Sequence, residues 1–166
     1  MGETNITLRT PDGIFNYRVG AIIINSDTNS ILMVKNEVSP FYYSVGGRVT
    51  FGESAQETVL REAFEETQIK FDIDKLAFIH ENFFTMDNAP YHEIALFYLM
   101  KPNIRVAEIK NNSFKEYDVE ETLCWLPINS LESLNIKPDF FKTELKSMAN
   151  GIKSFVTRNE ITFRLI

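Results

Sequence analysis

Three glutamates lie on one face of a predicted helix, where they could bind a metal ion. At about 100° of rotation per residue, Glu62, Glu65 and Glu66 share one side of the segment Ala55–Thr67. Like charges at these spacings repel each other, and Mg²⁺ or Mn²⁺, which prefer oxygen ligands, would turn the repulsion into coordination. The alternative is a solvated acidic face, and the three glutamates alone do not decide between the two.

A capping box specifies the start of this helix. The Ser54 hydroxyl can accept a hydrogen bond from the amide of Glu57, whose carboxylate can reach back to the amide of Ser54. Arg61 is the only cation of the helix and lies on a different azimuth from the three glutamates. An apolar arc is expected to pack on a sheet: Val59, Leu60, Ala63 and Phe64.

The spacing of the charged residues in Gly47–Ile69 resembles the Nudix box. That pattern is Gly, five residues, Glu, seven residues, Arg-Glu, an apolar residue, any residue, Glu-Glu, any residue, Gly and an apolar residue. The leading glycine and every charged position match: Gly47, Glu53, Arg61, Glu62, Glu65 and Glu66. Gln68 replaces the second glycine, whose left-handed conformation costs another residue about 1 kcal/mol or more, so the substitution concerns the loop geometry and not the charged residues.

The resemblance implies a hydrolase that uses Mg²⁺ or Mn²⁺. Nudix proteins cleave a phosphoanhydride bond, with water, in a nucleoside diphosphate linked to another group. An acidic site would repel such a substrate unless cations bridged its carboxylates and the phosphate oxygens. By position, Glu65 and Glu66 resemble the principal metal ligands, with Glu62 and Glu53 contributing directly or through water.

The same resemblance assigns the remaining roles. Arg61 would orient the glutamates by charge-assisted hydrogen bonds. The loop Gly46-Gly47-Arg48 would admit the phosphates. The general base could be Glu62 or Glu93, so that Glu62, Arg61 and Glu93 form the candidate catalytic set, although exposure on a strand end is the alternative for Glu93.

Aromatic residues supply candidates for binding the nucleotide base, although core packing is the alternative for each of them. The candidates are Phe83, Phe84, Tyr91 and Trp125, of which Phe83 and Tyr91 are the proposed substrate contacts. Nucleoside triphosphates, ADP-ribose, nucleotide sugars and dinucleotides all remain open as substrates. The rival function is that of a Nudix-like module that senses a nucleotide without cleaving it.

Apolar runs and turn residues predict the strands that hold this helix. The turn Thr10–Gly13 predicts a hairpin of Ile6–Arg9 and Ile14–Val19, continued by Ala21–Ile24. Further strands are expected at Ile31–Val34, Lys75–Asn82, Glu93–Met100 and Leu123–Leu126.

The second half of the chain is predicted from weaker signals. The polar stretch Lys101–Glu121 predicts a long surface loop, and a proline in the first turn predicts a helix over Pro138–Ala149. A closing hairpin is expected from Ile152–Val156 and Ile161–Leu165. Helices interleaved with a mixed sheet predict an α/β or α+β domain spanning residues 1–166, and the resemblance implies an α/β/α sandwich with a central mixed β-sheet.

Composition limits the partners. A net charge of −6 over 166 residues argues against coating a nucleic-acid polymer or an anionic membrane, because both need excess cationic side chains. Cys124 is the only cysteine, which excludes an intramolecular disulfide and a cysteine-cluster metal site. No apolar run approaches the roughly 20 residues of a membrane span, so a cytoplasmic protein is expected. The resemblance adds a homodimer as a further expectation.

Overall fold

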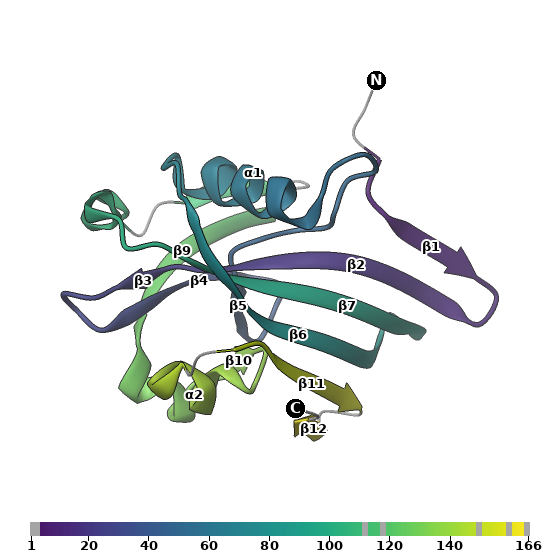
Figure 1. Cartoon of the computed structure of the whole chain (residues 1–166). Helices are drawn as coiled ribbons and strands as arrows, with labels where there is room; N and C mark the ends of the chain where they lie inside the picture. The colour runs from purple at the N-terminus through teal and green to yellow at the C-terminus, as the bar shows by residue number, and fades with distance from the viewer. Residues whose placement is uncertain (1–3, 111–112, 117–118, 149–150, 159–160, 165–166) are drawn as a thin grey trace.

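Two mixed β-sheets carry the site in the computed structural model of the chain, which describes residues 4–110, 113–116, 119–148, 151–158 and 161–164 (Figure 1). The first sheet has the order β1 (Thr7–Thr10), β2 (Gly13–Ile22), β7 (Ala89–Met100), β6 (Ile73–Met86), β11 (Lys153–Arg158) and β12 (Ile161–Arg164). The second has the order β10 (Ile136–Lys137), β5 (Tyr42–Ser44), β4 (Ser30–Asn36), β9 (Val119–Pro127) and β8 (Ser113–Glu116), with β3 (Ile24–Asn25) paired to β4.

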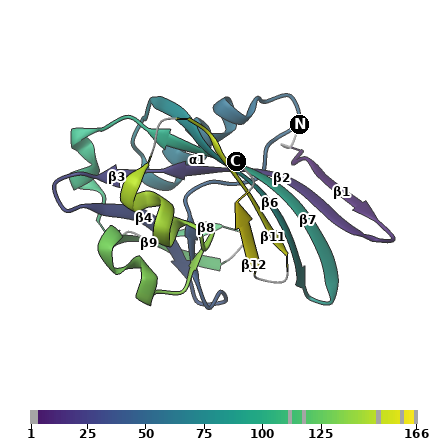
Figure 2. The same ribbon diagram turned by 60° about the horizontal axis from the view of Figure 1, so that its bottom comes forward.

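The two α-helices of the described residues lie on opposite sides of the strands. Helix α1 (Ala55–Thr67) lies on one side and the short helix α2 (Phe141–Glu144) on the other (Figure 1, Figure 2). The 3₁₀ helices are η1 (Ile104–Glu108), η2 (Ile128–Ser133) and η3 (Leu145–Ser147). The α+β class with mixed sheets is confirmed, although the strands form two sheets and not one central sheet. No described helix is long and apolar enough to cross a membrane.

The segment that follows β5 runs along the edge of β2 and joins the two sheets. Its backbone accepts hydrogen bonds from β2, with 2.8 Å from Ala21 N to Val45 O and 2.9 Å from Val19 N to Gly47 O. Farther along the segment, Ile6 N donates to Val49 O at 2.7 Å. The Gly46–Gly47 loop is therefore held by the backbone along an existing strand.

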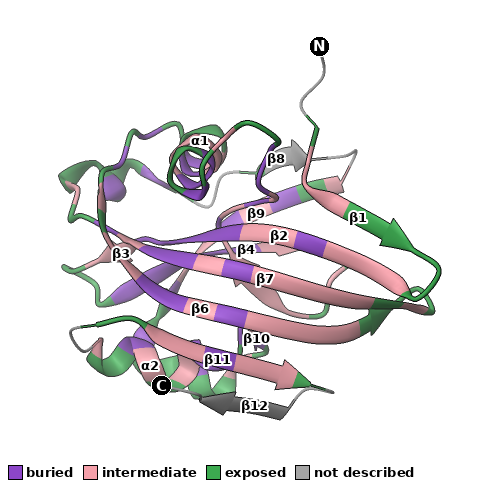
Figure 3. Ribbon diagram, turned by 45° about the vertical axis from the view of Figure 1, so that its right-hand side comes forward, coloured by how far each residue is buried: buried purple, intermediate pink, exposed green. Residues whose placement is uncertain are grey.

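Helix α1 packs on one face of the first sheet through a narrow apolar stripe. Val59 and Ala63 are fully buried, in one core with Val19, Ala21 and Leu123. Figure 3 shows this burial along the helix and the strands beneath it. The expected arc is corrected at one position, because Phe64 is 40% exposed and the small residues Ala55 and Thr58 are buried in its place.

A second core of aromatic residues fills the opposite side of the strands. Its rings come from β6, β7, β11 and the segment around α2: Phe78, Phe97, Phe140, Phe141 and Phe155. This core explains why the expected helix over Pro138–Ala149 is wrong in length. The segment begins and ends with i→i+3 hydrogen bonds, the tighter 3₁₀ path, and α-helix covers only Phe141–Glu144 before η3. Ala149 lies outside the described residues.

The predicted loop over Lys101–Glu121 is also corrected. It contains η1, strand β8 and the beginning of β9, while residues 111–112 and 117–118 lie outside the described part of the chain. Strand β9 has the polar run 120–122 near its start, and it pairs with the neighbouring β8 and with β4, which is distant in sequence and places Asn36 opposite Glu121. A strand with such a polar start shows little local hydrophobic pattern from which it could be predicted. Both predicted hairpins are present, at β1–β2 and at β11–β12, and Leu165 lies outside the described residues.

Candidate active site

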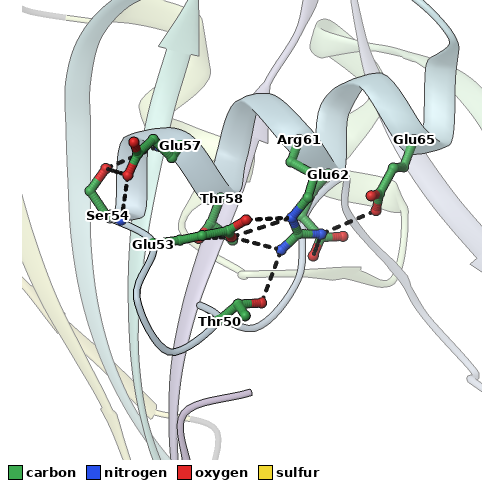
Figure 4. Close-up of polar contacts among 8 residues, drawn as sticks. All are labelled: Thr50, Glu53, Ser54, Glu57, Thr58, Arg61, Glu62 and Glu65. Atoms are coloured by element: carbon green, nitrogen blue, oxygen red, sulfur yellow. Dashed lines mark hydrogen bonds and ion pairs between the residues drawn. The ribbon is translucent and has the colours of Figure 1, made fainter. Parts of the chain in front are cut away.

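Arg61 stands at the centre of a group of carboxylates on α1 and the loop before it (Figure 4). Its Nε lies 3.0 Å from Glu53 Oε1, and its Nη1 lies 3.0 Å from Glu62 Oε1 and 3.1 Å from Glu65 Oε2. Its Nη2 donates to Thr50 Oγ1 at 3.2 Å. One guanidinium thus orients three of the four candidate metal ligands by charge-assisted hydrogen bonds.

These contacts favour the charged forms of Arg61 and Glu53. The hydrogen bond with Glu53 is the main cause that raises the pKa of Arg61, with Glu62 adding to it. The same hydrogen bond lowers the pKa of Glu53, helped by the Thr58 hydroxyl. Because a single guanidinium faces three carboxylates, the group keeps an excess of negative charge.

The Gly46–Gly47 loop lies directly against two of the helix glutamates. Gly46 N donates to Glu66 Oε1 at 3.0 Å. A Cβ on Gly47 would lie 2.4 Å from Glu62 Oε1, and a Cβ on Gly46, whose φ is +140°, would lie 2.3 Å from Val19 O. Only glycines allow β2 on one side and the carboxylates on the other to approach this closely.

Gln68 ends α1 in the conformation that the box glycine normally supplies. Its φ is 60° and its ψ is 19°, in the left-handed region, and its backbone N–H donates to Phe64 O at 2.7 Å. The side chain Nε2 also donates to Glu65 O at 2.9 Å. The substitution therefore keeps the helix terminus and adds a side-chain cap.

A buried network that sequence reasoning missed adjoins the group. Tyr43 Oη donates to Glu121 Oε1 at 2.5 Å, and Asn36 Nδ2 donates to Tyr43 Oη at 2.9 Å. Glu121 is only 7% exposed. Burial is the main cause that raises the pKa of Tyr43, the hydrogen bond to Glu121 adds to it, and the charge of Glu66 contributes at a lower level. A charged residue on the inward side of a strand, two positions before buried Leu123, is the signal that could have revealed Glu121.

The structure places Glu93 on β7. Its Oε2 lies 3.9 Å from Arg18 Nη1 of β2, and Arg18 in turn forms a backbone bridge with Arg48, the residue after Gly47. Arg48 Nη1 donates to Thr7 Oγ1 at 3.4 Å. Glu93 thus faces a cation beside the loop, while Glu62 touches the loop itself.

The two proposed aromatic contacts lie on opposite faces of the β6–β7 hairpin. Phe83 stacks on His92 with centroids 4.2 Å apart, and Phe84 stacks on Tyr91 at 5.0 Å. Since successive residues of a strand point to opposite faces, Phe83 and Tyr91 do not line one surface together. Trp125 donates from Nε1 to Ile109 O at 3.0 Å and so fixes the segment after η1.

The donor set fits a hard divalent cation. The candidate ligands are all carboxylates, the oxygen donors that Mg²⁺ and Mn²⁺ prefer. Among the described residues no cluster of His, Cys, Asp or Glu is already arranged as a metal site. However, Glu62 and Glu65 both place an oxygen within 3.1 Å of one nitrogen of Arg61, so two carboxylates already converge on a single cationic group.

Comparison with known proteins supports the likeness that the motif suggests. The profile of the NUDIX domain matches residues 15–146. A relative from Bacillus subtilis (strain 168), named "Putative 8-oxo-dGTP diphosphatase", is 44% identical over 52 residues, which cover 31% of this chain and only 35% of the relative. A MutT protein from Bacillus halodurans has a similar structure, with a TM-score of 0.61 and 18% identity over 87% of this chain and 92% of that one. A NUDIX hydrolase from Nitrosomonas europaea has a TM-score of 0.55 and 16% identity over 79% of this chain and 86% of that one.

The fold and the carboxylate group together define a protein of the Nudix type. The domain match covers most of the chain and includes every residue of the box. The chain therefore belongs to the Nudix family, as the spacing from Gly47 to Ile69 predicts.

Proposed function

We propose that the protein is a Mg²⁺- or Mn²⁺-dependent pyrophosphohydrolase that cleaves a nucleoside diphosphate linked to another group. The observation that carries the proposal is the set of carboxylates gathered around Arg61 beside the Gly46–Gly47 loop. Nucleoside triphosphates are the first substrates to test, because the Bacillus subtilis relative is named as a diphosphatase of this class. ADP-ribose, nucleotide sugars and dinucleotides follow.

In this proposal Glu65 and Glu66, with Glu62 and Glu53, hold the metal. The bound metal would neutralise the phosphate oxygens and make a water molecule more acidic. Arg61 holds the carboxylates in place by the hydrogen bonds described above.

Glu62 is the base that the geometry favours. The attacking water forms a bond to phosphorus, the phosphoanhydride oxygen leaves with the bond electrons, and the proton of the water passes to a carboxylate. The Glu62 and Glu93 side chains are both 14% exposed and both lie near an arginine, but Glu62 also lies against Gly47 of the site loop, whereas Glu93 lies on β7. We therefore assign the proton to Glu62.

The unit proposed is the whole chain. The domain match covers residues 15–146, yet β1 pairs with β2 and β11 pairs with β6, so that both flanks belong to the first sheet. A nucleotide is the proposed partner, because a metal-loaded acidic site suits a small polyanion better than the acidic surface suits a nucleic-acid polymer.

The rival proposal of a nucleotide sensor without catalysis is disfavoured by the retained carboxylates. All four box glutamates are present, and Arg61 is hydrogen-bonded to three of them. A binding module has no need of an arrangement that orients so many charged groups.

A substrate panel with and without metal tests the function. Phosphate release from nucleoside triphosphates, ADP-ribose, nucleotide sugars and dinucleotides is measured with Mg²⁺, with Mn²⁺ and with chelator. Turnover that needs metal is expected for at least one compound. Thermal stabilisation by a nucleotide with no turnover of any compound would favour the sensor instead.

Glu66→Gln tests the metal-ligand assignment. The substitution keeps an oxygen that can accept the hydrogen bond from Gly46 N, so the fold should persist, whereas the loss of the charge should lower metal-dependent kcat by about 100-fold or more. The control is Glu132→Gln, which removes an exposed ion pair with Lys146 and should leave kcat unchanged. Wild-type turnover by Glu66→Gln would contradict the assignment.

A further inference from the structure

Three side chains of the second sheet form a tie across its strands. Tyr43 Oη lies 2.5 Å from Glu121 Oε1, and Asn36 Nδ2 reaches both partners, at 2.9 Å and 3.4 Å. A carboxylate buried to this degree is costly unless hydrogen bonds compensate the loss of water. Charge-assisted hydrogen bonds are about twice as strong as neutral ones, so the tie is firm.

The tie spans three strands and ends next to the site loop. In the order β5-β4-β9, Tyr43 pairs with Val34 and Asn36 pairs with Glu121, so the side chains connect β5 to β9 over β4. Strand β5 then leads within three residues to Gly46, whose N–H donates to Glu66.

Strand β5 has little backbone pairing to hold it. It is three residues long, and its register with β4 contains only two residue pairs, as does its register with β10. Asn36 also holds the loop between β4 and β5, because its Oδ1 accepts hydrogen bonds from Ser39 N at 2.7 Å and Val38 N at 3.1 Å. The side-chain hydrogen bonds of the tie therefore hold β5 in place where its short backbone ladder provides few hydrogen bonds.

We propose that Tyr43 is a positioning residue, whose hydroxyl fixes β5 to Glu121 and so holds Gly46 against Glu66. Tyr43 acts on the reaction through the loop and not by contact with the substrate. The kinetic consequence rests on the proposed function, whereas the structural consequence does not.

Tyr43→Phe removes only the hydroxyl, and Tyr42→Phe is the matched control. The neighbouring Tyr42 ring packs in the aromatic core on the other side of the sheet, with Lys35 Nζ 5.4 Å from its centroid, contacts that a phenyl ring preserves. Hydrogen exchange of the Gly46 amide, followed by NMR, should accelerate about tenfold in Tyr43→Phe and stay at the wild-type rate in Tyr42→Phe. An unchanged Gly46 exchange rate in Tyr43→Phe would overturn the inference, whatever the activity of the protein.

Kinetics on a substrate found in the panel separates positioning from substrate contact. A loop displaced by a fraction of an ångström should lower kcat about 10-fold or more with KM within twofold of wild type. A raised KM with unchanged kcat would instead make Tyr43 a substrate contact and overturn the inference. If the wild-type protein turns over no compound, the proposed function fails and amide exchange still decides the role of Tyr43.

A second variant guards against a Tyr43→Phe protein that does not fold. Glu121→Gln keeps the shape and one acceptor oxygen but removes the charge from the tie, and should accelerate Gly46 exchange in the same direction. In the double variant the acceleration of Gly46 exchange should be smaller than the two single effects combined, because both substitutions act on one interaction. Full additivity, or wild-type exchange in Glu121→Gln, would contradict the tie.

Discussion

Gly47 shows how a single missing side chain sets the position of a carboxylate. Alanine at Gly47 would place its Cβ 2.4 Å from Glu62 Oε1, so the carboxylate must move. Because a displacement of about 1 Å can cost 100-fold in rate, Gly47→Ala should lower kcat/KM about 100-fold in the phosphate-release assay.

Gly151→Ala serves as the control for that substitution. Gly151 has a φ of +99° and nothing within 4 Å of an added Cβ, so alanine there should cost about 1 kcal/mol of unfolding free energy and leave activity intact. Equal activity losses in both variants would mean that Gly47→Ala acts through stability.

Residues adjacent in sequence were predictable, whereas partners from distant strands were not. The box residues could be recognised because one helix and one loop contain all of them at fixed spacings. Glu121 comes close to Tyr43 only through the register of β5, β4 and β9. No local pattern around either residue encodes that register.

At the scale of the element, the capping box fixes the start of α1. Ser54 Oγ accepts from Glu57 N at 3.2 Å, and Glu57 Oε2 accepts from Ser54 N at 2.8 Å. Ser54→Ala should lower the free energy of unfolding by about 1 kcal/mol in urea titrations. Gln56→Ala, at an exposed position of the same turn, should change it by much less; similar losses would show that helix propensity and not the cap is measured.

The contrast between α1 and α2 explains which elements can be predicted. The bounds Ala55–Thr67 follow from local signals, namely the cap, the apolar period and the position of Gln68 in the box pattern. The segment after Pro138 has an equally good start, but Phe140, Phe141 and Leu145 are buried in the aromatic core, and α-helix is limited to Phe141–Glu144, with i→i+3 hydrogen bonds before it and η3 after it. Tertiary packing overrides local preference there.

For the whole molecule, His80 links stability to pH. It is 6% exposed, its Nε2 lies 2.7 Å from Thr157 Oγ1 of β11, and burial, with a smaller effect of Lys137, lowers its pKa from 6.5 to about 4. The unfolded chain therefore binds a proton at a higher pH than the folded protein. The resulting stabilisation is complete above pH 6.5 and is lost as the pH falls toward 4, by an amount of about 3 kcal/mol.

His80→Gln keeps a hydrogen-bonding group and removes the titration. Urea unfolding at pH 7 and pH 4.5 should show a smaller loss of stability on acidification for this variant than for the wild type. His92→Gln is the control, because His92 is 42% exposed and lies on the surface beside Glu81. An equal acid sensitivity of His80→Gln and the wild type would contradict the role of His80.

The placement of Arg61 among Glu53, Glu62 and Glu65 also bears on how the protein folds. Without a counter-charge, each like-charged pair at these spacings would destabilise the helix by about 0.2–0.5 kcal/mol. Here Arg61, a residue of the same helix, supplies the positive counter-charge. Under the proposed function, divalent metal would then be required for turnover and not for folding.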